Sequence, residues 1–139
     1  TRSQRTKGFT DKKKRYPDMA VIAEEFVDCE RNKEIIAMEK CLARNVRFDA
    51  LYAQSDGMAT GARMAMKRAG IDLGSKVIVG IDNIDEAREA IKKGEQDATF
   101  TYPTAGKEGA QAAISIIKGE KVAKDQIISF RLVTKENLN

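Results

Sequence analysis

Apolar residues along the chain recur at two spacings, one typical of helices and one typical of short buried strands. Met58, Ala62, Ala65 and Ala69 recur at helical spacing and fall on one face of a predicted helix. The run Lys-Val-Ile-Val-Gly-Ile at 76–81 is short and apolar, as in a strand buried on both faces. On these patterns we expect helices over residues 3–15, 30–44, 57–69, 83–92 and 105–118. We expect strands over residues 20–26, 48–53, 76–81, 97–101 and 127–133.

Strands that alternate with helices predict an α/β fold, a parallel sheet with helices on both faces. Ligands of such sheets bind outside the carboxyl ends of the strands. That rule selects five residues that end or follow the predicted strands: Cys29, Ser55, Asp56, Asp82 and Tyr102. The sequence therefore places a candidate binding site at one edge of the sheet.

Three of these residues have alternative roles. Asp56 stands where the N-cap of the helix at 57–69 belongs, and Asp82 stands just before the helix predicted from Asn83. Cys29 is either a reactive thiol or a cysteine that packs or lines a cleft. Asp56 and Asp82 can thus be read in two ways: each either caps a helix or binds the ligand.

The composition of the 139 residues, 42% apolar and 33% charged, suits one globular domain. The chain contains no histidine, which excludes a Ser-His-Asp triad and histidine metal ligands. Its two cysteines, Cys29 and Cys41, cannot form a four-cysteine zinc site. No glycine-rich phosphate-binding loop follows a predicted strand. We therefore expect neither an enzyme nor a bound cofactor or metal.

The positive charge is confined to the start of the chain. Residues 1–15 hold seven basic residues and one acidic residue, whereas the remaining residues hold 18 basic and 20 acidic ones. A nucleic-acid-binding face would interleave basic residues with aromatic ones. The basic run at 12–15 is instead typical of the solvated side of a helix, and we expect no nucleic-acid partner.

Six segments in order along the chain form a recognisable set: QRTKGF at 4–9, YAQSDGMATGA at 52–62, VIVGID at 77–82, IKKG and DAT within 91–99, GEK at 119–121 and LVTKEN at 132–137. Together they resemble the ribose- and galactose-type periplasmic sugar-binding proteins, a type I family related to the LacI-type regulators. Each segment is weak evidence by itself, but six in register along essentially the whole chain are specific.

The resemblance implies a Rossmann-like lobe and a binding function. Members of this family hold a sugar between two α/β lobes and pass it to the permease of an ABC transporter or to a membrane receptor. It also implies a periplasmic or extracellular location. Two alternatives stay open: the ligand-sensing domain of a LacI-type transcriptional regulator, and that of a membrane histidine kinase.

The resemblance also assigns roles to residues. Arg5 matches an arginine that donates to sugar hydroxyls, and Asp82 matches an aspartate that accepts from them. Cys29 stands where an aromatic ring usually stacks on the sugar, and Ser55 stands where an asparagine is usual. Tyr102 stands where a glutamine or asparagine is common. We therefore expect a ligand site that differs from that of a plain ribose-binding protein.

The family pattern further divides the chain. Residues 1–102 and 131–139 would form the C-terminal ligand-binding lobe, and the fold would be incomplete without a strand that precedes the first helix in the family. Residues 103–130 would pack on an N-terminal lobe that the sequence lacks, as in the C-terminal part of a longer protein. The apolar face of the predicted helix at 105–118 would then lack its partner, and we expect this fragment to form a dimer or to aggregate.

Overall fold

The structure is a computed structural model that describes residues 2–27 and 30–138. Its helices are α1 (Arg2–Lys13), α2 (Arg31–Ala43), α3 (Asp56–Arg68), α4 (Asp85–Lys92) and α5 (Gly106–Ile117). Its strands are β1 (Ala50–Tyr52), β2 (Val77–Asp82), β3 (Ala98–Thr101) and β4 (Leu132–Thr134). Short 3-10 turns follow at Leu73–Ser75 and Lys135–Asn137. No helix among the described residues is long and apolar enough to cross a membrane.

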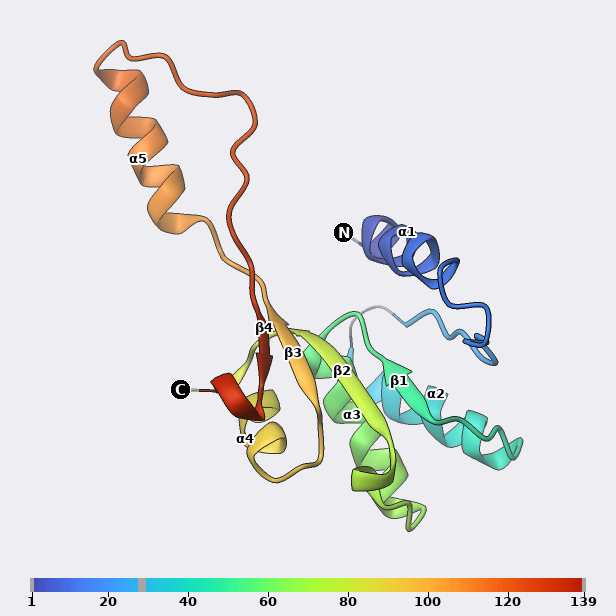
Figure 1. The fold of residues 1–139 in the computed structure, drawn as a ribbon. Coiled ribbons are helices and arrows are strands. Elements are labelled where there is room, and N and C mark those ends of the chain that lie inside the picture. Colours follow the sequence, from blue (N-terminus) through green and yellow to red (C-terminus); the bar gives the residue numbers. More distant parts are fainter. Residues whose placement is uncertain (1, 28–29, 139) are drawn as a thin grey trace.

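The four strands form one sheet in the order β1-β2-β3-β4, which confirms the α/β class. β1, β2 and β3 run parallel, with Leu51 opposite Ile78 and Gly80 opposite Thr99. β4 is antiparallel to β3, so the predicted parallel sheet is confirmed for β1, β2 and β3 and differs at the last strand. The reason is the path of the chain, which leaves the carboxyl end of β3, forms α5 and returns to the same end without crossing the sheet (Figure 1).

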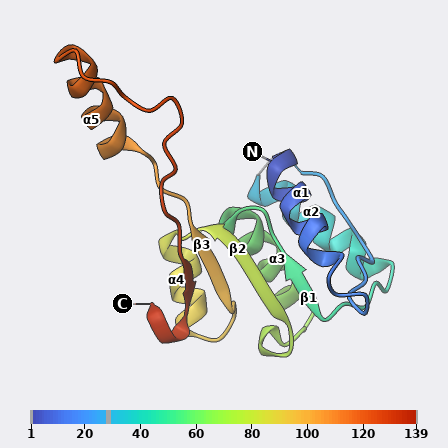
Figure 2. The same ribbon diagram turned by 45° about the horizontal axis from the view of Figure 1, so that its top comes forward.

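Helices cover both faces of the sheet. α2, α3 and α4 lie on one face and α1 lies on the other (Figure 2). The main core lies between α2, α3 and the sheet, where Met66 and Ile78 are fully buried. Gly61 allows the close approach of α2 to α3, because a Cβ atom there would lie 2.6 Å from the backbone oxygen of Arg31.

The predicted strand at 20–26 is wrong, although the segment is extended. Among the described residues, none in this segment joins the sheet. An apolar cavity of about 580 Å³ lies between residues 19–27, α1 and β1. Val21, Ile22 and Phe26 are each more than half exposed. The apolar residues favour an extended segment, but a strand also needs a neighbour for its backbone N–H and C=O groups, and the cavity lies between this segment and β1.

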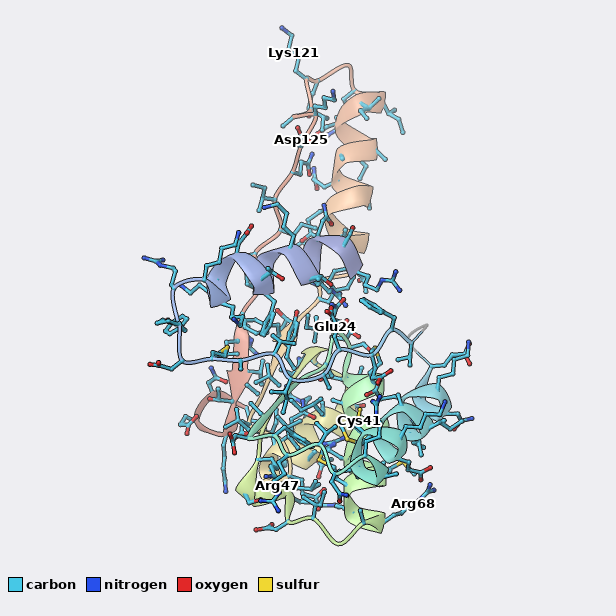
Figure 3. The ribbon with its side chains drawn as sticks, turned by 90° about the vertical axis from the view of Figure 1, so that its right-hand side faces the viewer. Glu24, Cys41, Arg47, Arg68, Lys121 and Asp125 are labelled. Atoms are coloured by element: carbon cyan, nitrogen blue, oxygen red, sulfur yellow. The ribbon has the colours of Figure 1, made fainter. Side chains whose placement is uncertain are left out.

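Residues 102–131 form an arm that projects from the body of the molecule (Figure 1). Lys121 and Asp125 lie at its far end (Figure 3). The arm contains α5, which confirms the predicted helix at 105–118 but has no buried residue. Ile117 and Ile127 are 84% and 97% exposed. The arm therefore presents apolar side chains that the described part of the chain does not cover.

Candidate functional site

The carboxyl ends of three parallel strands meet beside the N-terminal half of α1. There the Arg5 guanidinium lies at the centre of a group of polar side chains. Its Nη2 atom is 3.6 Å from Oδ1 of Asp82, and its Nη1 atom donates to the backbone carbonyl of Gln54. Its Cζ atom is 5.0 Å from the centre of the Tyr102 ring, within reach of a cation–π interaction. The structure thus brings together three of the predicted residues: Arg5, Asp82 and Tyr102.

One aromatic contact anchors α1 over the sheet and so places Arg5. The ring of Phe9 stacks on Tyr52 of β1, with ring centres 5.0 Å apart and planes 5° from parallel. Arg5 precedes Phe9 by four residues, so both side chains lie on one face of the helix. A second link joins Thr6, whose hydroxyl accepts from Nε2 of Gln54 at 2.7 Å.

Asp82 ends β2 in an unusual backbone conformation. Its φ angle is 114°, and that of Asn83 is 57°, so two consecutive non-glycine residues have positive φ. Such conformations are costly and persist only where surrounding contacts hold them. Burial raises the pKa of the Asp82 carboxyl, while the nearby Arg5 guanidinium lowers it and the charge of Asp56 raises it further. The nearby backbone N–H of Asp56 also lowers its pKa.

Ser55, not Asp56, caps the helix that follows β1. The Ser55 side chain accepts from the backbone N–H of Met58 at 3.2 Å and is the N-cap of α3. The alternative reading of Asp56 as the cap is therefore wrong. The alternative for Asp82 is wrong as well, because α4 begins at Asp85 with Ile84 as its N-cap.

Asp56 lies beneath the site and not on its surface, because it is 0% exposed. Its Oδ2 atom accepts from the Thr99 hydroxyl at 2.7 Å, and its Oδ1 atom accepts from Gln96 at 3.1 Å. Burial raises the pKa of this carboxyl, and the hydrogen bonds from Thr99 and Gln96 oppose that rise. Asp56 therefore supports the site from below.

The remaining predicted residues differ in their surroundings. Tyr102 is 60% exposed and forms an open side of the site, whereas Ser55 is buried. Cys29 lies outside the described residues. The described residues contain no group of three or more ligating side chains that could hold a metal ion.

Sequence reasoning missed Gln54, Asn83 and Thr99. Gln54 follows β1 directly after Ala53, so the strand-end rule could have selected it; its side-chain oxygen is buried without a partner among the described residues. Asn83 follows the end of β2 and could have been selected in the same way. Thr99 carried no local signal, because it lies inside a strand and its contacts depend on the sheet register.

The chemistry of the assembled groups suits neutral, hydroxyl-rich molecules. A guanidinium offers several N–H donors in a fixed plane, and a carboxylate offers only acceptors. A hydroxyl group both donates and accepts, so adjacent hydroxyls can bridge the two charges through charge-assisted hydrogen bonds.

Comparison with known proteins finds a matching family model and relatives that are named as binding proteins. A family model described as "Periplasmic binding protein domain" matches residues 1–121. The chain is 31% identical over 118 residues to the ribose import binding protein of Salmonella typhimurium, with 84% of this chain and 39% of that protein covered. It is 30% identical over 142 aligned positions to a xylitol-binding protein of Mycolicibacterium smegmatis, with 97% of this chain and 39% of that protein covered.

A solved structure extends the comparison to the fold. An ABC transporter solute-binding protein from Bacillus halodurans with bound myo-inositol matches with a TM-score of 0.86 and 30% identity. The match covers 96% of this chain and 47% of that one. The chain spans about two fifths of the length of the curated relatives, at 39% of each.

Proposed function

The chain belongs to the periplasmic binding protein domain family, and from that membership we propose that it binds a small polyhydroxylated molecule for an ABC importer. The proposed ligand class is a monosaccharide or a related polyol, held at the strand ends and passed to a membrane permease. The proposed location is periplasmic or extracellular. The observation that carries the proposal is the placement of Arg5 against Asp82 at the carboxyl ends of the parallel strands, 3.6 Å apart.

The relatives support this ligand class. Ribose, xylitol and myo-inositol, which their names mention, differ in ring size and in whether they form a ring at all. They share neighbouring hydroxyl groups on a neutral carbon skeleton. A guanidinium and a carboxylate side by side can bind neighbouring hydroxyl groups, whichever carbon skeleton carries them.

In the proposed complex, Arg5 donates to ligand hydroxyls and Asp82 accepts from them. Tyr102 offers an aromatic face and a hydroxyl at the open side of the site. Ser55 and Cys29 stay in the proposed ligand-binding set, while Asp56 acts from beneath. No step is catalytic, so the ligand is bound and released unchanged.

The arm has a proposed role of its own. We place residues 1–102 and 131–139 in one ligand-binding lobe and residues 103–130 in contact with a second lobe across the ligand. The exposed isoleucines of the arm support this division, because apolar side chains of this kind are normally covered in a binding-competent molecule.

Nuclear magnetic resonance titration tests the proposed function, because it detects weak as well as tight binding. The isotope-labelled protein is titrated separately with ribose, xylitol and myo-inositol. We expect at least one of them to shift the resonances of the Arg5 side chain and of the Asp82 amide in a saturable manner. None of the three shifting these signals would contradict the proposed site.

Variants then assign the contacts. Arg5→Ala and Asp82→Ala should each weaken binding by about 1–3 kcal/mol, since each leaves ligand hydroxyls without a charged partner. Lys12→Ala and Glu89→Ala, which remove exposed charges from α1 and α4, serve as controls and should bind normally. Unchanged affinity in folded Arg5→Ala and Asp82→Ala would refute the assignment.

A further inference from the structure

A buried polar cluster lies directly beneath the backbone turn that carries Asp82. Asp56 and Thr99 are both 0% exposed, and Gln96 is 2% exposed. The Thr99 hydroxyl donates to Oδ2 of Asp56 at 2.7 Å, and Nε2 of Gln96 donates to Oδ1 at 3.1 Å. The three side chains come from α3, from β3 and from the residues just before β3. A buried carboxylate destabilises the fold unless other contacts compensate, so we expect the cluster to have a structural or functional role.

The cluster holds the backbone of the turn. The N–H of Asn83 donates to the Thr99 hydroxyl at 3.2 Å, and the N–H of Ile84 donates to Oδ2 of Asp56 at 3.3 Å. These two N–H groups follow the residue whose φ angle is 114°, and Asn83 itself has φ 57°. Two consecutive left-handed residues that are not glycine need outside contacts to persist. Thr99 and Asp56 supply these contacts.

Gly80, which lies in β2 with Asp82, leaves room for the buried carboxylate of Asp56. A Cβ atom at Gly80 would lie 2.0 Å from Oδ1 of Asp56, so the carboxylate fits only against a residue without a side chain. Asp56 therefore contacts the turn after Asp82 through its side chain.

We propose that Thr99 and Asp56 are positioning residues that hold the turn at Asp82–Ile84 and thereby aim the Asp82 carboxylate toward Arg5. Neither side chain is exposed, so both act through Asp82 and not on a ligand. The inference rests on the proposed function for its binding measurement, but the orientation of Asp82 can be measured without any ligand.

Substitutions at position 99 provide the test. Thr99→Val keeps the shape of the side chain and removes the hydroxyl that joins Asn83 to Asp56. Thr99→Ser keeps the hydroxyl and removes a methyl group. Thr101→Val, two residues along β3, removes a hydroxyl that accepts from the backbone N–H of Arg131 in the arm. It is the matched control.

Two measurements separate positioning from stability. The first follows the titration of the Asp82 carboxyl and the Arg5 side-chain signal by nuclear magnetic resonance without ligand. The second measures affinity for whichever of ribose, xylitol and myo-inositol binds the unaltered protein. For Thr99→Val we expect an altered Asp82 titration and a loss of affinity of tenfold or more. For Thr99→Ser we expect both to return to within about twofold of normal, and for Thr101→Val no change.

A folded Thr99→Val variant with an unchanged Asp82 titration and normal affinity would overturn the proposal, whatever its stability. If no ligand binds, the proposed function fails while the ligand-free titration still decides the positioning role. If Thr99→Val does not fold, hydrogen exchange of the unaltered protein decides. Protected amides at Asn83 and Ile84 support the proposal that Thr99 and Asp56 hold the turn. Exchange of these amides at the rate of an unstructured peptide overturns it.

Discussion

At the scale of single residues, three acidic residues have a backbone conformation or surroundings that their residue type does not prefer. Asp82 has a left-handed backbone, and Asp56 is a buried carboxylate. Glu34 of α2 is also buried, at 7% exposed, and it borders the apolar cavity. Each of these departures costs free energy of folding, so each gives a prediction about stability that a single substitution can test.

Glu34 should make the protein less stable as the pH rises. Burial, and then repulsion from Glu25, raise the pKa of its carboxyl from 4.5 to about 7. The folded state then binds a proton more tightly than the unfolded state, so the free energy of unfolding falls between about pH 4.5 and pH 7. Glu34→Gln removes this dependence, and its stability gain over the unaltered protein should be larger at pH 8 than at pH 5, by up to about 3 kcal/mol.

Urea unfolding at the two pH values checks this expectation. Glu39→Gln, on an exposed position of the same helix, is the control and should shift stability by similar amounts at both pH values. A Glu34→Gln curve that runs parallel to that of the unaltered protein across this range would contradict the prediction.

Gly80 should tolerate no side chain. In Gly80→Ala the added Cβ would lie 2.0 Å from Oδ1 of Asp56, and the buried carboxylate would have to leave its partners. We expect a loss of about 2–4 kcal/mol in the free energy of unfolding. Gly8→Ala in α1, where no atom lies within 4 Å of the new Cβ, should be neutral or slightly stabilising. Chemical unfolding compares the two variants, and equal stabilities would refute the steric argument.

At the scale of elements, α3 organises the body of the molecule. It packs against α2 and the sheet on its apolar face, and its N-terminus points to the site through Ser55 and Asp56. A displacement of α3 would therefore alter both the packing of the core and the position of Asp82. Gly61 lies against the first turn of α2 in this packing.

Gly61→Ala should push α2 away from α3. The new Cβ would lie 2.6 Å from the backbone oxygen of Arg31 and 3.1 Å from Cβ of Glu34. Backbone yields less easily than a side chain, and we expect a loss of about 1–3 kcal/mol in thermal or urea unfolding. Gly57→Ala, in the same helix, meets no atom nearer than 3.9 Å and is the matched control. The same loss in both variants would point to the helix itself and not to the contact between α2 and α3.

At the scale of the whole molecule, two apolar regions lack cover among the described residues. One is the arm, where Ile116 and Ile117 are 65% and 84% exposed. The other is the cavity beside β1, where one edge of that strand has no neighbouring strand within residues 2–27 and 30–138 (Figure 2). Exposed apolar faces and open strand edges both favour association with another chain.

We predict that the 139-residue chain forms dimers or larger assemblies. Light scattering during size-exclusion chromatography should show a mass that rises with concentration. Ile117→Lys removes an exposed apolar side chain from the arm and should lower the associated fraction several-fold. Gln111→Lys adds the same charge at another exposed position of α5 and should leave association almost unchanged. A folded monomer from micromolar to millimolar concentration would show that these surfaces do not drive assembly.

Local patterns were sufficient where an element depends on its own residues. The helical spacing of Met58, Ala62 and Ala65 predicted α3, and the apolar run at 76–81 predicted β2. The strand-end rule led to Asp82 and Tyr102, because the carboxyl ends of parallel strands meet at one edge wherever the strands begin. Arg5 lies on a helix and was found only through the family resemblance.

Tertiary contacts decided the rest, because they join residues that no local pattern connects. The sequence by itself determined the α/β class, the helices and the edge of the sheet at which the candidate site lies. Only the structure decided that 20–26 lacks a neighbouring strand, that β4 runs antiparallel and that Ser55, not Asp56, is the cap. The hydrogen bond between Thr99 and Asp56 spans 43 residues. Helical spacing depends on neighbours within a few positions, whereas burial and strand pairing depend on which distant segments meet when the chain folds.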